Sequence, residues 1–317
     1  MSDDMPALLL IGHGSRSEAG VAEFWDFTKV LQGQAPDIAM EFGFIELAEP
    51  HLDTALDKLV ARGPCHVIGV PLVLLGAGHM KNDGPACLDR ARRRHPEVRF
   101  TYGTEMGVHP LALSVAGDRA MEVVAEHGLD PAEVAVLLVG RGSSDPDANA
   151  DLAKVARLVW DGRGIGWVEP AFISLASPSV PEGLERCRRL GARHIVVIPY
   201  FLFTGVLVDR IRDQAAAWTL DHPDVNVITG PHLGGDPRLA RLVVERFHQA
   251  GQGTGARPNC DCCVYRVALP GHEAKGGLPL RAAQHDHDHG HDHQHDHSND
   301  HQHRGGVNNN HGTHRAT

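Results

Sequence analysis

Three common features are absent from this chain of 317 residues, and each absence excludes a class of protein. No apolar run approaches the ~20 residues that a membrane-spanning helix needs, so we expect no membrane partner. The apolar run from Met5 to Ile11 is too short for a signal-peptide core and has no cationic flank, which predicts a cytoplasmic protein. Positive charge is not in excess either. The formal net charge is −10, which argues against a nucleic-acid partner.

Several enzyme signatures are also missing. None of the five lysines is followed by serine or threonine, so there is no P-loop for ATP. There is no G-x-S-x-G nucleophile elbow, and Gly12-His13-Gly14 lacks the third glycine of the dinucleotide-binding pattern. We therefore expect neither ATP-driven chemistry nor serine-based hydrolysis. Of the six cysteines, three lie within helical or strand patterns and are expected to pack as core residues: Cys65, Cys87 and Cys187.

The sequence repeats itself at an offset of 128 residues. Gly12-His13-Gly14-Ser15 returns as Gly140-Arg141-Gly142-Ser143, and Phe44-Ile45-Glu46-Leu47-Ala48 returns as Phe172-Ile173-Ser174-Leu175-Ala176. This duplication predicts two tandem domains, residues 1–128 and residues 129–250.

Strand and helix patterns alternate within each copy. Ala7 to Ile11 is a continuous apolar run closed by a glycine, which is typical of a strand buried on both faces, and residues 17–34 have helical spacing. Four strands and four helices are expected in each copy. The predicted fold class is therefore α/β, with each domain a four-stranded, mainly parallel sheet flanked by helices.

Three polar residues of the first copy are replaced in the second. The replacements are His13 by Arg141, Glu46 by Ser174 and His79 by Leu207. All three follow predicted strands, and ligands bind at the carboxyl ends of strands in open parallel sheets, so we expect them to converge. Two imidazoles and a carboxylate suit a first-row dication such as Co²⁺, Ni²⁺, Fe²⁺ or Zn²⁺. The alternative is that each residue has an ordinary structural or surface role and was replaced independently.

The composition changes after Ala250. Residues 251–283 begin with a glycine-rich linker and contain Cys260, Cys262 and Cys263. These three thiols fall short of a four-ligand zinc site or iron–sulfur cluster, so a fourth ligand would have to come from elsewhere in this subunit or from a second one. An unmetallated thiol cluster is the alternative.

Residues 284–317 form a low-complexity tail that carries eleven of the 23 histidines. No hydrophobic pattern is present, so we expect disorder. Alternation with aspartate favours metal capture, storage or delivery over a neutral solvated tail or a tag. The alternating histidines are His285, His287, His289, His291, His293, His295 and His297.

Three motifs in order resemble the class II tetrapyrrole chelatases in their long, tandem-domain form. They are residues 10–16 (LIGHGSR), residues 44–50 (FIELAEP) and residues 74–83 (LLGAGHMKND). The resemblance covers residues 5–250, and the cysteine cluster and His-rich tail are similar to tail features of that family. It implies ATP-independent insertion of Co²⁺ into sirohydrochlorin, a step of cobalamin biosynthesis. The substrate partners would be sirohydrochlorin and the divalent metal, and the oligomeric state is left open.

The same resemblance implies roles for individual residues. His13 and His79 would bind the metal with Glu46, and His13 would also take pyrrole protons with help from Glu46. Cys260, Cys262 and Cys263 would hold an iron–sulfur cluster. Glu46 would face the substrate, and the turn from Leu75 to His79 would line the macrocycle pocket. The substrate-binding set is Ser15, Arg16, Glu46, Leu75, Gly76, Ala77 and Gly78. Independently of the resemblance, the positive charges of Arg16, Lys81 and Arg141 make them candidate partners for substrate carboxylates. Two alternatives remain: a ferrochelatase of sirohaem synthesis and a non-catalytic metal-storage or delivery protein.

Overall fold

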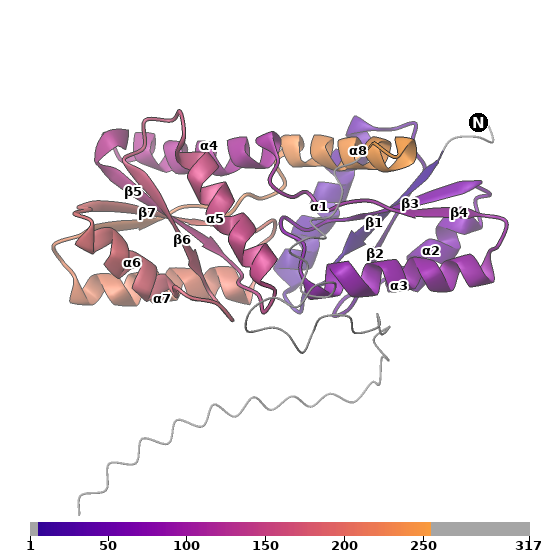
Figure 1. The fold of residues 1–317 in the computed structure, drawn as a ribbon, viewed down its shortest axis with the longest axis horizontal. Coiled ribbons are helices and arrows are strands. Elements are labelled where there is room, and N and C mark those ends of the chain that lie inside the picture. Colours follow the sequence, from indigo (N-terminus) through magenta and orange to yellow (C-terminus); the bar gives the residue numbers. More distant parts are fainter. Residues whose placement is uncertain (1–5, 255–317) are drawn as a thin grey trace, which may run out of the picture. The chain divides into compact units, whose positions relative to one another are not determined.

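Two parallel sheets form the framework of residues 6–254, the part of the chain that the computed structural model describes (Figure 1). The side chain of His79 is also outside the described set. The predictions for Cys260, Cys262 and Cys263 and for the histidines from His285 to His297 lie outside the described residues.

The first sheet has the strand order β2-β1-β3-β4, with every neighbouring pair parallel. Its strands are β1 (Ala7–Gly12), β2 (Met40–Phe44), β3 (His66–Pro71) and β4 (Arg99–Tyr102). All six residues of β1 are buried, as expected for a central strand covered on both faces by helices.

The second sheet repeats this topology as β6-β5-β7-β8, again entirely parallel. Its strands are β5 (Val134–Gly140), β6 (Trp167–Phe172), β7 (His194–Pro199) and β8 (Asn226–Thr229). The predicted fold class, two tandem α/β domains with four-stranded sheets, is confirmed.

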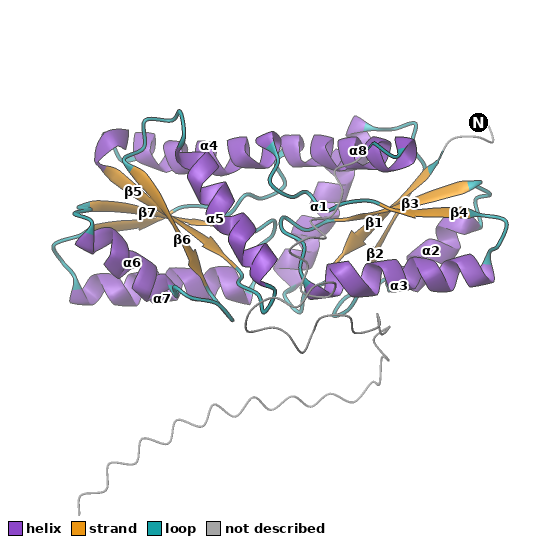
Figure 2. Ribbon diagram, in the orientation of Figure 1, coloured by secondary structure: helices purple, strands orange, loops and turns teal. Residues whose placement is uncertain are grey.

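Helices cover the faces of both sheets (Figure 2). Several begin at a side chain that accepts a hydrogen bond from a free backbone N–H of the first turn, such as Ser17 for α1 and Asp145 for α5. The helices are α1 (Glu18–Gln34), α2 (Leu52–Val60), α3 (Gly78–Arg94), α4 (Pro110–Glu126), α5 (Pro146–Trp160), α6 (Val180–Arg189), α7 (Val206–Asp221) and α8 (Pro237–Gln252), with a 3₁₀ turn η1 at Pro131–Glu133.

The last helix of each repeat packs against the sheet of the other repeat. Helix α4 contacts β7 and α5, whereas α8 contacts β3 and α1 (Figure 1). One continuous core therefore contains Leu8 and Ile68 of the first sheet together with Val136 and Val196 of the second. Each packing unit thus combines residues from both sequence repeats.

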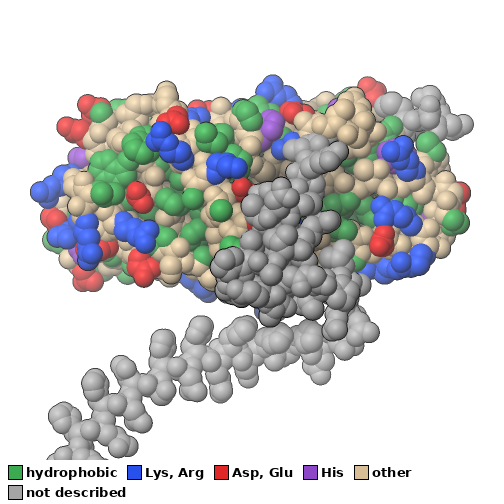
Figure 3. All heavy atoms as spheres, in the orientation of Figure 1, with side chains coloured by type: hydrophobic (Ala, Val, Ile, Leu, Met, Phe, Trp, Pro, Cys, Tyr) green, Lys and Arg blue, Asp and Glu red, His purple; other side chains and the backbone are tan. Residues whose placement is uncertain are grey.

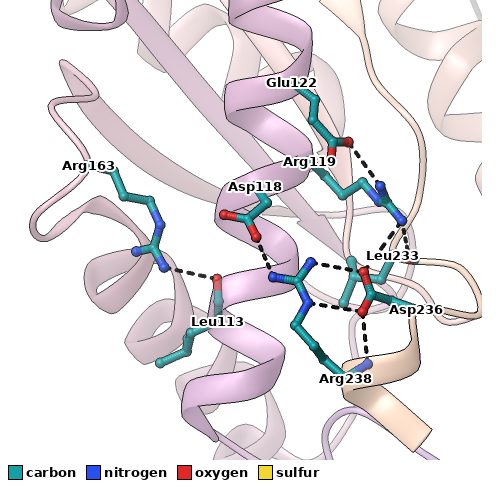
Figure 4. Close-up of polar contacts among 8 residues, drawn as sticks. All are labelled: Leu113, Asp118, Arg119, Glu122, Arg163, Leu233, Asp236 and Arg238. Carbon is teal, nitrogen blue, oxygen red and sulfur yellow. Dashed lines mark hydrogen bonds and ion pairs between the residues drawn. The ribbon is translucent and has the colours of Figure 1, made fainter.

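Polar contacts hold α4 and α8, the helices that pack on the sheet of the other repeat, in place (Figure 4). The guanidinium of Arg238, at the start of α8, pairs with Asp118 of α4 as well as with Asp236. Arg163, which follows α5, donates to the carbonyl of Leu113 in α4 at 3.3 Å. These contacts tie α4 to segments that lie far from it in the sequence.

Two of the three cysteines expected in the core are there. Cys87 and Cys187 are buried, but the prediction for Cys65 is wrong, because Cys65 is exposed. It precedes the first residue of β3 and so lies outside the covered part of the sheet.

Basic and acidic side chains are interspersed on the face drawn in Figure 3. Among the described residues, no helix is both long and apolar enough to cross a membrane.

Candidate functional site

Two of the three predicted site residues meet where β1 and β2 end. His13 follows β1, and Glu46 lies two residues beyond β2. The parallel pairing continues past the strands, because the backbone N–H of Glu46 donates to the carbonyl of His13 at 3.1 Å. This pairing brings His13 Nε2 to 3.5 Å from Glu46 Oε1. The side chains are 23% and 36% exposed, but His13 Nε2 itself is buried, so the exposed parts of the pair are other atoms of the two side chains.

A close backbone crossing makes this pairing possible. Gly14 has φ +97°, and a Cβ built on it would lie 1.7 Å from the carbonyl oxygen of Glu46. Leu47, next to Glu46, also has a positive φ of 64°, which is uncommon for a bulky residue. The second repeat has the same geometry, with positive φ at Gly142 and Leu175. The crossing is therefore a feature of the scaffold in both repeats.

The chemistry at this crossing differs between the repeats. In the second repeat, the N–H of Ser174 donates to the carbonyl of Arg141 at 2.9 Å, as Glu46 does to His13 in the first. The side chains at these positions are a guanidinium and a hydroxyl instead of an imidazole and a carboxylate. Because the second repeat forms the same turn without them, His13 and Glu46 are not needed for the fold.

His79 lies in the first turn of α3, directly after the glycine-rich turn Leu75–Gly78. Its side chain is outside the described residues, so its place as the third metal ligand stays a prediction. Among the side chains that are described, no group of three His, Cys, Asp or Glu could hold a metal ion. The described part of the site is therefore the His13–Glu46 pair.

Sequence reasoning missed one carboxylate beside the glycine-rich turn. A Cβ built on Gly76 would lie 3.0 Å from Cδ of Glu105, so the Glu105 carboxyl is close to this turn. Glu105 lies three residues beyond β4, at the same carboxyl edge of the sheet as Glu46. The rule that located Glu46 could have located Glu105, had it been applied to the fourth strand.

The predicted substrate-binding residues have different surroundings. The hydroxyl of Ser15 accepts a hydrogen bond from the N–H of Ser17 at 3.0 Å, and this contact shapes the turn before α1. Arg16 is exposed, and Leu75 is half-buried. Their contacts with substrate remain predictions.

The expectation that Lys81 serves a substrate carboxylate is not supported by its surroundings. Its ammonium lies 2.7 Å from Asp145 Oδ2 and 3.1 Å from Asp147 Oδ2. Burial by itself lowers the pKa of Lys81, but hydrogen bonds and charge from the two aspartates outweigh it and raise this pKa above its ordinary value. Lys81 is thus already paired within the protein. Arg141, by contrast, is exposed.

Comparison with known proteins places both repeats in one family. The CbiX family model matches residues 7–123 and again residues 135–250. The two matches together cover most of the chain and correspond to the two sheets with their helices.

Relatives of known activity align with this chain over most of their length. The chain is 38% identical over 269 residues to a sirohydrochlorin cobaltochelatase of Priestia megaterium, covering 84% of this chain and 87% of that protein. It is 32% identical over 266 residues to a sirohydrochlorin ferrochelatase of the same organism, covering 84% of this chain and 97% of that protein.

A solved structure has a similar fold. SirB from Bacillus subtilis, determined with Fe³⁺, aligns with a TM-score of 0.69 at 29% identity and covers 78% of this chain and 97% of its own. SirB from the subspecies spizizenii, determined in complex with cobalt, aligns with a TM-score of 0.64. The resemblance to the chelatases inferred from three motifs is confirmed, and the chain belongs to the CbiX family as a tandem-repeat member.

Proposed function

We propose that this chain inserts Co²⁺ into sirohydrochlorin without ATP, and that His13 and Glu46 of the first repeat do the chemistry. One observation carries the proposal. The two repeats share one backbone crossing, yet only the first carries an imidazole and a carboxylate 3.5 Å apart. Residues that the fold does not require and that form a reactive pair are the best candidates for catalysis.

Metal insertion has two chemical requirements that this pair can meet. The two pyrrole N–H protons must leave the macrocycle, and the metal must lose its water ligands. A neutral imidazole accepts protons near pH 7. The Glu46 carboxylate beside His13 would balance the positive charge that the ring gains, and it would hold the ring in place.

The metal is a substrate here and must be released after it is bound. One imidazole with one carboxylate is an incomplete ligand set that can release the ion, whereas a closed four-ligand site would retain it. We propose His79, in the first turn of α3, as the second imidazole ligand.

Sirohydrochlorin carries several carboxylates that need partners. Arg16, Arg141 and the free N–H groups at the start of α3 are the proposed partners, because the N-cap Ala77 provides no side-chain hydrogen bond to that helix. One exposed helix terminus contributes only ~0.3–1 kcal/mol to binding an anion. Several such contacts are therefore needed.

Cobalt is the proposed metal because the cobaltochelatase of Priestia megaterium is more similar to this chain than the ferrochelatase of that organism, at 38% against 32% identity. The ferrochelatase reaction is the second candidate, supported by that second relative. The cytoplasmic location, the iron–sulfur cluster on Cys260, Cys262 and Cys263, and metal storage by the His-rich tail stay predictions.

The test is a metal-insertion assay on the purified full chain without ATP and without oxygen. Sirohydrochlorin is mixed with Co²⁺ or Fe²⁺, and the absorbance change of the macrocycle is followed. We expect turnover with Co²⁺ to exceed that with Fe²⁺. Faster turnover with Fe²⁺ would support the ferrochelatase reaction, and a lack of turnover with either metal would contradict both.

A further inference from the structure

An ion bridge joins the two repeats beside the first turn of α3. Lys81 lies two residues after His79, and its ammonium contacts Asp145 and Asp147 at 2.7 and 3.1 Å. Both carboxylates are buried, with Asp145 only 1% exposed. A bridge with this much burial is screened far less by solvent and salt than an ordinary surface ion pair.

Asp145 is held in place by hydrogen bonds within the second repeat. Asp145 is the N-cap of α5, and its Oδ1 accepts a hydrogen bond from the N–H of Asp147 at 3.2 Å. Its own N–H donates to the hydroxyl of Ser143 at 3.0 Å. The second oxygen, Oδ2, faces Lys81. A capped helix start in the second repeat thus determines where the Lys81 ammonium lies.

Among the described contacts, side chains from two other elements reach the first turn of α3. Its N-cap, Ala77, makes no side-chain hydrogen bond. On the side of β4, the hydroxyl of Tyr102 donates to the carbonyl of Met80 at 2.7 Å. The Lys81 bridge supplies a second anchor, from α5. Two anchors on different elements restrict both the translation and the rotation of this turn.

The bridge occurs on only one side of the duplicated fold. At the offset of 128, the counterpart of Lys81 is Asp209, which pairs with Arg212 inside its own helix. The counterpart of Asp145 is Ser17. The corresponding contact, between the turn before α7 and the first helix, is a hydrogen bond from the N–H of Thr204 to Glu23 at 2.7 Å. The first repeat therefore has both His79 and the bridge. The second repeat has Leu207 at the position of His79 and lacks the bridge.

We propose that the bridge of Lys81 with Asp145 and Asp147 positions the first turn of α3, and with it His79, for metal transfer, which makes Lys81 a positioning residue. This inference rests on the proposed function. It assigns the second repeat a role in the reaction, because that repeat supplies both carboxylates. The position of a reacting group strongly affects the rate, because a misplacement of about 1 Å can lower it about 100-fold.

The test removes the bridge without leaving a buried charge. Lys81→Met alone would remove the ammonium that faces the buried carboxylate of Asp145 and could unfold the chain. The triple variant Lys81→Met, Asp145→Asn, Asp147→Asn is neutral, and asparagine is as good an N-cap as aspartate. The matched control is Arg238→Met. It breaks the ion pair between Arg238 of α8 and Asp118 of α4, which also joins the two repeats but lies away from the site.

Kinetics on the full-length variants separate the outcomes. We expect the triple variant to melt near the wild type and to keep its KM for sirohydrochlorin, while its kcat falls by about 10-fold or more. Arg238→Met should keep the wild-type kcat. Lys81→Arg, which keeps the charge, should recover most of the activity. A triple variant with the kcat of Arg238→Met would overturn the inference while leaving the proposed function intact.

A double-mutant comparison excludes direct substrate binding by Lys81. If Lys81 acts only through the aspartates, Lys81→Met adds no further loss of kcat to the Asp145→Asn, Asp147→Asn variant. A further loss of kcat together with a raised KM for sirohydrochlorin would mean that Lys81 contacts a substrate carboxylate, and would overturn the inference. If the wild-type chain turns over neither metal, the proposed function fails and the inference fails with it.

Discussion

Replacing Gly14 by alanine tests whether the backbone crossing serves the reaction in one repeat only. The added Cβ would start 1.7 Å from the carbonyl oxygen of Glu46, so the two segments must separate by more than 1 Å. The positive φ of Gly14 adds an unfavourable backbone conformation of about 1–2 kcal/mol. With the displaced contact included, we expect a loss of roughly 3 kcal/mol in the free energy of unfolding.

Gly142→Ala is the matched control in the second repeat, where the corresponding Cβ would lie 1.8 Å from the carbonyl oxygen of Ser174. Both variants should lower Tm by a similar amount, about 6–12 °C, as measured by circular dichroism. Only Gly14→Ala separates His13 from Glu46, so only this variant should lose turnover, by about 100-fold at a temperature where both are folded. Equal loss of turnover in the two variants would refute the reasoning that the repeats differ in chemistry.

Two further predictions concern stability. Burial alone raises the pKa of Asp53, but hydrogen bonds and charge from Arg90 and Arg94 hold this pKa below its usual value. The ionised carboxylate therefore stabilises the fold at pH values above its pKa in the unfolded chain. This stabilisation is lost as the pH falls through the pKa of the folded state. Asp53→Asn should therefore show a smaller decrease in Tm on acidification below about pH 4 than the wild type. Buried Arg246 of α8 donates to the carbonyls of Glu105 and Met106, so Arg246→Met should cost about 2–3 kcal/mol in denaturant unfolding, and no change in the midpoint would contradict this role for α8.

Much of the fold follows from local patterns. The buried strand β1 is a continuous apolar run, and its glycine-closed end is visible in the sequence. Parallel strand order then brings His13 and Glu46 to one edge, and the structure places them there. These two inferences need only the period of the apolar residues and the geometry of parallel sheets.

Other features depend on contacts that no local pattern records. The helical patterns of α4 and α8 are those of ordinary amphipathic helices, so the sequence does not show that each covers the sheet of the other repeat. The bridge from Lys81 to Asp145 spans 64 residues and two repeats. The charge of Lys81 therefore indicates a substrate partner in the sequence, whereas its aspartate partners are visible only in the folded chain.

The central claim is that His13 of the first repeat carries the reaction. The most direct measurement compares ATP-free insertion of Co²⁺ into sirohydrochlorin by the wild type, His13→Ala and His95→Ala. His95 also lies beside a carboxylate, with Nε2 3.6 Å from Asp57, but it follows α3 at the opposite end from the site. We predict that His13→Ala lowers kcat by about 100-fold or more while His95→Ala keeps the wild-type value. Full activity in His13→Ala would contradict the account.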